Sequence, residues 1–301
     1  MRKKILIIIA AVFLIAAALL FTFRDPVKTM VSKMSLQDKI TQMLMMDFRY
    51  WDESLEEGSD QTGFTEMNDS VRSILNQYRF GSVIYFAQNL TDTDQAFQLT
   101  MDLQDAAMEN NGIPMLICAD QEGGSVYRLA TGTALPGNMA LSATGNIEYA
   151  RMAGAIIGSE LNALGINTTL APVVDVNSNA NNPVIGLRSF GDDPQTVGTM
   201  ASAVIEGMAK HNVIGCAKHF PGHGDTSTDS HYGLPIVEKT KAELLQCELN
   251  PFEIAVSQGV ETTQYGPVGF ITQCPPFPSI PLPQNLFEHN FLKILSKLAI
   301  F

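Results

Sequence analysis

The residues best suited to chemistry lie in one segment, residues 218–235, which reads KHFPGHGDTSTDSHYGLP. Its prolines and glycines indicate a loop rather than a helix. An aspartate two residues before a histidine, as in Asp229 and His231, can accept the imidazole N–H, fix the tautomer and stabilise the imidazolium. This pair is therefore a candidate general acid/base dyad.

Two other interpretations of the segment stay open. The side chains could be solvated loop residues, or they could form a metal site, since four of them are ligand types: His219, His223, Asp225 and His231. No helical HExxH spacing is present, and Lys218 beside the first histidine disfavours a bound cation. Acid/base chemistry on a neutral or anionic small molecule accounts for the lysine as well, so we expect neither a metal nor a cofactor.

The rest of the chain alternates between apolar strand-like runs and amphipathic helical runs. Strands are predicted at residues 82–86, 114–119, 168–176 and 213–219. Helices are predicted at residues 94–110, 147–164, 194–210 and 239–258, and one more opens at a capping box, Ser35 to Asp38, and runs through residues 40–46. The alternation predicts a parallel sheet covered by helices.

Polar or glycine-rich stretches follow each strand, for example DQEGGS after Ala119 and KHFPGHGD after Ala217. An α/β barrel assembles its site from such stretches at the carboxyl ends of its strands, whereas a doubly wound sheet concentrates them at one switch point. We therefore expect a TIM-type (β/α)8 barrel. Five good strands can be counted, four of them with the bounds given above, and at best a sixth lies around residues 268–272, so the barrel is predicted to be incomplete at its C-terminal side.

The N-terminal residues predict on which side of the membrane the protein is located. Residues 5–21 form an unbroken apolar run of 17 residues behind Arg2, Lys3 and Lys4. Such a helix is roughly 25 Å long, at the short limit for a membrane span. We expect residues 1–24 to be an uncleaved transmembrane anchor, or alternatively a cleaved signal peptide, and the remainder to be extracytoplasmic.

Composition excludes several classes of protein. The formal net charge of −12 argues against nucleic-acid binding, which needs a basic face. With 46% hydrophobic and 17% charged residues, the chain can bury a large core. The four cysteines show no CxxC spacing, and Cys118 and Cys216 lie in apolar strand-like runs, where we expect them to be small buried hydrophobes.

The segment KHFPGHGDTSTDSH closely resembles the signature loop of the glycoside hydrolase family 3 β-N-acetylhexosaminidases. Five further segments resemble the same family in the same order: SLQDKITQMLMM, GSVIYFAQN, ICADQEGGSVYRL, INTTLAPVVDVN and NPVIGLRSFGDDP. The resemblance covers roughly residues 34–260 and implies the barrel domain of that family.

The resemblance also implies roles for individual residues. It makes His231 the general acid/base and Asp229 the residue that orients it, and it implies a sugar pocket made of Asp120, Arg128, Arg188, Lys218 and His219. Asp175 is expected to support the loops. From the residues alone, Asp120 and Glu122 could instead form a turn that caps a helix, and Arg188 could make an ion pair with Asp192 or Asp193.

The resemblance stops before the family's catalytic nucleophile, an aspartate at the end of the seventh strand, and no matching segment occurs in this chain. Residues 261–301 instead contain six of the 15 prolines. We therefore predict three regions: an anchor or signal at 1–24, a partial barrel at 25–260 and a divergent tail at 261–301. The tail is expected to reflect a frameshift or premature stop that leaves the chain poorly folded and catalytically impaired.

The resemblance implies an ancestral activity of the type EC 3.2.1.52. A retaining, monomeric β-N-acetylglucosaminidase would remove terminal N-acetylglucosamine (GlcNAc) from peptidoglycan fragments (muropeptides) or related glycans. A histidine acid/base does not repel an anionic substrate, so phosphorolysis is an open variant. The alternatives are a non-catalytic glycan-binding fragment, an unfolded remnant and a metal hydrolase.

Overall fold

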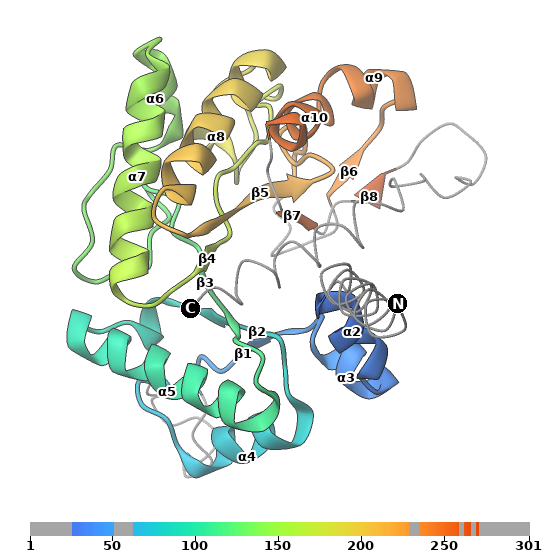
Figure 1. The fold of residues 1–301 in the computed structure, drawn as a ribbon. Helices are drawn as coiled ribbons and strands as arrows, with labels where there is room; N and C mark the ends of the chain where they lie inside the picture. The colour runs from blue at the N-terminus through green and yellow to red at the C-terminus, as the bar shows by residue number, and fades with distance from the viewer. Residues whose placement is uncertain (1–25, 51–62, 229–234, 259–261, 266–268, 271–301) are drawn as a thin grey trace, which may run out of the picture. The chain divides into compact units, whose positions relative to one another are not determined.

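The computed structural model describes residues 26–50, 63–228, 235–258, 262–265 and 269–270 of the chain (Figure 1). It divides into two compact units, one made of Met1–Thr41 with Leu282–Phe301 and the other of Gln42–Pro281. The described part of the first unit holds helices α2 (Pro26–Lys33) and α3 (Leu36–Thr41). The predicted capping box opens α3, since Asp38 N donates to Ser35 Oγ at 3.0 Å.

The second unit is built on a six-stranded, wholly parallel sheet. Its strands follow the order β1 (Met45–Asp47), β2 (Ser82–Tyr85), β3 (Leu116–Ala119), β4 (Thr168–Thr169), β5 (Ile214–Phe220) and β7 (Thr262–Tyr265). Each strand pairs with the next along the sheet, and the order never reverses. This winding is that of a barrel rather than a doubly wound sheet, so the prediction of a barrel-like α/β fold is confirmed.

Helices follow the strands as the sequence pattern predicts. The bounds are α4 (Asp69–Tyr78), α5 (Thr93–Asn111), α6 (Asn138–Ala143), α7 (Ile147–Ala163), α8 (Pro194–Ala209), α9 (Lys241–Gln246) and α10 (Asn250–Ser257). There are also two short 3₁₀ helices in the described part of the chain: η1 (Ala87–Asn89) follows β2, and η2 (Gly186–Arg188) precedes α8. The apolar face predicted for α5 is buried, and Asp193 caps α8 by accepting from Thr196 N at 2.8 Å.

Helices α7 and α8 lie side by side with their backbones in contact (Figure 1). A Cβ atom on Gly154 would lie 2.0 Å from Val204 O, and one on Gly207 would lie 2.2 Å from Arg151 O. Only glycine allows this approach, so these two positions set how closely the helices pack.

Four predicted elements differ from the structure. The helix predicted to run from the capping box through residues 40–46 is α3, which ends at Thr41, and residues 45–47 form β1 instead. The helix predicted at residues 239–258 is divided into α9 and α10, because Pro251 belongs to the first turn of α10. The strand predicted at residues 168–176 is regular only in β4. The sixth strand is β7 rather than residues 268–272; Gly269–Phe270 form β8, which pairs with β6 (Ile236–Val237) in a separate sheet.

No helix in the described ranges is long and apolar enough to cross a membrane. The longest, α5, has 19 residues but carries four acidic side chains, whereas a span needs about 20 predominantly apolar residues. This finding contradicts the predicted membrane-anchored, extracytoplasmic localisation. Residues 1–24, on which the predicted anchor or signal peptide depended, lie outside the described residues, as does most of the predicted tail.

Two thiols lie inside the sheet. Cys118 of β3 is fully buried and Cys216 of β5 is 5% exposed, and both pack against Leu170 after β4. Burial raises the pKa of the Cys118 thiol well above its usual value. The prediction that these two cysteines are small buried hydrophobes is confirmed.

Candidate active site

A cluster of charged residues gathers at the carboxyl ends of the strands. Asp120 directly follows β3, and Glu122 lies two residues further on. Lys218 and His219 belong to the last part of β5, and Arg188 ends η2. Because the strands are parallel, their carboxyl ends share one edge of the sheet, which brings these side chains together.

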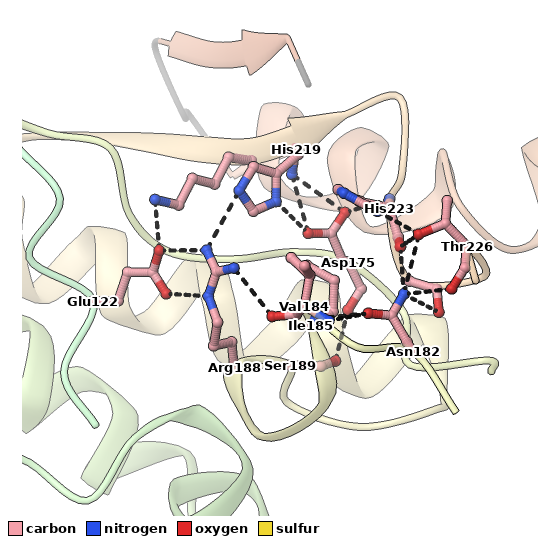
Figure 2. A network of polar contacts seen from close by, with 12 residues as sticks. Glu122, Asp175, Asn182, Val184, Ile185, Arg188, Ser189, His219, His223 and Thr226 are labelled. Atoms are coloured by element: carbon pink, nitrogen blue, oxygen red, sulfur yellow. Dashed lines mark hydrogen bonds and ion pairs between the residues drawn. The ribbon is translucent and has the colours of Figure 1, made fainter. Parts of the chain in front are cut away.

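Lys218 and Glu122 form the buried base of the cluster. Lys218 Nζ lies 2.7 Å from Asp120 Oδ1 and 2.6 Å from Glu122 Oε1, and the two side chains are 3% and 1% exposed. Arg188 binds Glu122 through two parallel hydrogen bonds, Nε to Oε2 at 2.9 Å and Nη2 to Oε1 at 2.7 Å (Figure 2). Buried charges persist in proteins when they are paired in this way.

The charges around Glu122 determine its ionisation. Burial acts to raise the pKa of Glu122, but the positive charges of Lys218 and Arg188 outweigh burial and hold that pKa below its usual value. Glu122 is therefore a carboxylate at neutral pH. It has no proton to donate as a general acid, and its role is to hold the two cations.

Asp175 organises the histidines of the same segment. It is fully buried, its Oδ2 lies 2.6 Å from His219 Nδ1, and its Oδ1 accepts from His223 N at 2.7 Å. Arg188 Nη2 lies 3.4 Å from His219 Nε2. A guanidinium can only donate, so this contact fits a His219 whose proton is on Nδ1 and points at Asp175.

Four side chains of the cluster remain partly exposed and can touch a ligand. These are Asp120 (16%), His219 (15%), Arg188 (17%) and Arg128 (25%), and Arg128 Nη2 lies 3.6 Å from Asp120 Oδ2. The cluster thus has two layers: buried groups hold the charges, and exposed acceptors and donors face outward. Such a set can bind several hydroxyl groups of one molecule at once.

The structure brings together five of the seven predicted site residues: Asp120, Arg128, Arg188, Lys218 and His219. Asp229 and His231 lie outside the described residues. The alternative interpretation, in which Arg188 pairs with Asp192 or Asp193, is wrong, because Arg188 forms its ion pair with Glu122. Within the ranges described, no group of three or more His, Cys, Asp or Glu side chains has a metal-binding arrangement.

Glu122 is a site residue that the sequence-based assignment of the pocket left out. Its signal was its place two residues after Asp120, on the same stretch that follows β3. That signal does not distinguish a buried partner for two cations from an acid in an exposed turn, because the partners Arg188 and Lys218 are 66 and 96 residues away in the sequence.

The fold and this cluster define a barrel-type α/β domain with a group of charged side chains at the carboxyl ends of its strands. The chain belongs to glycoside hydrolase family 3: residues 35–270 match the model of the glycosyl hydrolase family 3 N-terminal domain. The match includes β7 and β8, beyond the point at which the segment-by-segment resemblance ends.

Relatives and solved structures agree with this assignment. The chain is 41% identical over 220 residues to β-hexosaminidase A of Pseudoalteromonas piscicida, covering 70% of this chain and 37% of that protein. It is also similar to the family 3 β-N-acetylglucosaminidase of Paenibacillus sp. FPU-7, with a TM-score of 0.72 and 40% identity over 79% of this chain and 43% of that one.

A third similar structure is NagZ of Neisseria gonorrhoeae in complex with N-trifluoroacetyl-D-glucosamine, with a TM-score of 0.65 and 28% identity. The match covers 75% of this chain and 64% of that one. The chain thus spans less than two thirds of the length of each of these three proteins.

Proposed function

We propose that this chain provides the sugar-binding barrel of a β-N-acetylhexosaminidase that removes terminal GlcNAc from peptidoglycan fragments or related glycans. The observation that carries the proposal is the two-layered cluster of Asp120, Arg128, Arg188 and His219 above Lys218 and Glu122. Asp120 would accept hydrogen bonds from sugar hydroxyls, and the arginines would donate to sugar oxygens. Family membership supports the GlcNAc specificity.

In this proposal His231 is the general acid/base and Asp229 orients it. The protonated imidazole can donate its proton to the leaving oxygen, and the neutral imidazole that remains can then accept a proton from water. Neither form repels a substrate that carries a carboxylate. For the same reason phosphate, an anion, could replace water as the acceptor of the sugar.

The proposal predicts that any hydrolysis of 4-nitrophenyl N-acetyl-β-D-glucosaminide by the wild-type protein depends on His231, so that His231→Ala lowers the rate by about 10²–10⁴-fold. A wild-type rate no higher than background would favour the binding function described below. Arg72→Met, on the exposed face of α4, is the control and is expected to keep the wild-type rate. Equal rates for wild type and His231→Ala would remove His231 from the mechanism. Repeating the assay with inorganic phosphate tests the acceptor, because a rate independent of phosphate means hydrolysis alone.

A second candidate function, glycan binding without cleavage, is favoured by the state of the carboxylates. A retaining glycosidase needs a carboxylate nucleophile that reaches the sugar. Of the acids in the described cluster, Glu122 and Asp175 are 1% and 0% exposed, and Asp120 is already paired with Lys218 and Arg128. Binding of GlcNAc that Asp120→Asn abolishes, without any turnover by the wild type, would identify this function.

A further inference from the structure

Asn182 occupies a junction between two loops of the candidate site. Its side chain is almost fully buried, and its Oδ1 accepts hydrogen bonds from Val184 N at 2.9 Å and Ile185 N at 2.7 Å. Its Nδ2 donates to His223 O at 2.8 Å and to Thr226 O at 3.0 Å. One amide therefore ties the loop before η2 to the segment that follows β5 (Figure 2).

The first loop carries Arg188. Arg188 Nη1 donates to Val184 O at 3.2 Å, and Arg188 N donates to Ile185 O at 2.8 Å. Val184 thus binds Asn182 through its N–H and the guanidinium of Arg188 through its carbonyl. A displacement of Asn182 would be passed to the Arg188 side chain through this one residue.

The second segment leads to His219. His223, whose carbonyl accepts from Asn182, donates its N–H to Asp175, and Asp175 holds His219 Nδ1. The contact between Arg188 Nη2 and His219 Nε2 closes the path. The result is a closed ring of contacts, which we call the Asn182 ring: Asn182, Val184, Arg188, His219, Asp175 and His223.

We propose that Asn182 is a positioning residue that fixes Arg188 relative to His219, so that these two sugar contacts act as a unit. The inference rests on the proposed function, in which both residues bind GlcNAc. A primary amide suits this junction because it presents an acceptor on one side and two donors on the other, which neither a carboxylate nor an aliphatic side chain can do. Because the ring of contacts is closed, a change that loosens Arg188 also loosens His219.

Asn179 offers a matched control on the same segment. Its Nδ2 donates to Thr226 O at 3.2 Å and its Oδ1 accepts from Asn181 N at 3.0 Å. It contacts the same turn as Asn182, but none of the side-chain hydrogen bonds given for it among the described residues reaches Val184, Ile185 or Arg188. A purely structural effect on the turn should therefore appear in variants of both asparagines.

The test is a ¹⁹F NMR titration with N-trifluoroacetyl-D-glucosamine as the probe. Asn182→Leu is expected to weaken binding about tenfold or more and Asn179→Leu less than about threefold, a tenfold loss being about 1.4 kcal/mol. Asn182→Asp keeps the acceptor but loses the donor, and it is expected to weaken binding as well. The double variant Asn182→Leu/Arg188→Met should bind within about threefold of Arg188→Met alone, because the two residues act through one contact set.

A ligand-free readout keeps the outcome clear if Asn182→Leu folds poorly or the probe does not bind. The ¹⁵N shifts of the His219 ring in Asn182→Asp are expected to move, since the ring of contacts that holds the imidazole is opened, and to stay unchanged in Asn179→Leu. Unchanged His219 shifts in both Asn182 variants, or wild-type affinity in both, would overturn the inference.

The inference and the proposed function fail in different ways. If Arg188→Met and Asp120→Asn weaken binding but the Asn182 variants do not, the pocket is correct and Asn182 does not position it. If wild-type protein does not bind the probe, or if neither pocket variant weakens binding, the proposed pocket is wrong. In that case the His219 shifts still decide whether Asn182 holds the ring.

Discussion

Replacing Lys218 by methionine is expected to lower the free energy of unfolding by about 3–5 kcal/mol, the range typical when one partner of a buried ion pair is removed. Methionine preserves most of the side-chain volume but removes the charge that lies within 2.7 Å of both Asp120 and Glu122. Two carboxylates would then face each other in a buried site. Urea unfolding followed by circular dichroism measures the loss.

Two variants control for this prediction. Lys210→Met removes a lysine that is 56% exposed and 3.9 Å from Glu206, so it should cost no more than about 1 kcal/mol. The double variant Lys218→Met/Asp120→Asn removes one of the repelling carboxylates and should be less destabilised than Lys218→Met alone. A loss below about 1 kcal/mol for Lys218→Met would mean that the buried cluster contributes little to folding.

Asp175→Asn is expected to cost about 2–4 kcal/mol and to weaken sugar binding. The fully buried carboxylate accepts from His219 and from the backbone N–H of His223. An asparagine has the same shape, but its amide nitrogen is a donor that would face other donors, and an unsatisfied buried group costs about 1–3 kcal/mol. Glu109→Gln, exposed on α5, is the matched control and should change stability by no more than about 0.5 kcal/mol.

The same residue predicts a pH dependence. Burial acts to raise the pKa of Asp175, but the hydrogen bonds from the His219 ring and from the backbone N–H groups of His223 and His219 hold that pKa below its usual value. The carboxylate therefore stabilises the fold above the unfolded pKa of about 4, and this contribution is lost as the pH falls through the lower folded pKa. The difference between wild type and Asp175→Asn should be largest near neutral pH and shrink below about pH 4; a difference that does not depend on pH would contradict this.

Elements with a local signal were predictable from the sequence. Residues 96, 99, 103, 106 and 107 repeat with helical spacing, and all five are buried in α5. Asp193 and Pro194 marked the start of α8 because a side-chain cap and an N1 proline act within one turn. In contrast, β1 has only three residues, too few for a periodic signal, and its strand geometry comes from pairing with β2.

The candidate site divides in the same way. The residue types of the candidate site could be identified because they cluster at strand ends and resemble the motifs of one family. Their partners could not, since the bonds between Arg188 and Glu122 and between His219 and Asp175 cross 66 and 44 residues of sequence. Asn182 has no local signal either, because its role depends on two loops that only the folded sheet brings together.

The two buried thiols also allow the opening of the domain to be measured by thiol labelling. Cys118 and Cys216 belong to strands on either side of β4, so a thiol reagent can reach them only when the middle of the sheet separates. Cys247, between α9 and α10, is partly exposed, although burial still raises its pKa to about 11. Labelling at Cys247 thus reports on the exposure of the helical surface. The slower labelling at Cys118 and Cys216 measures how often the sheet opens.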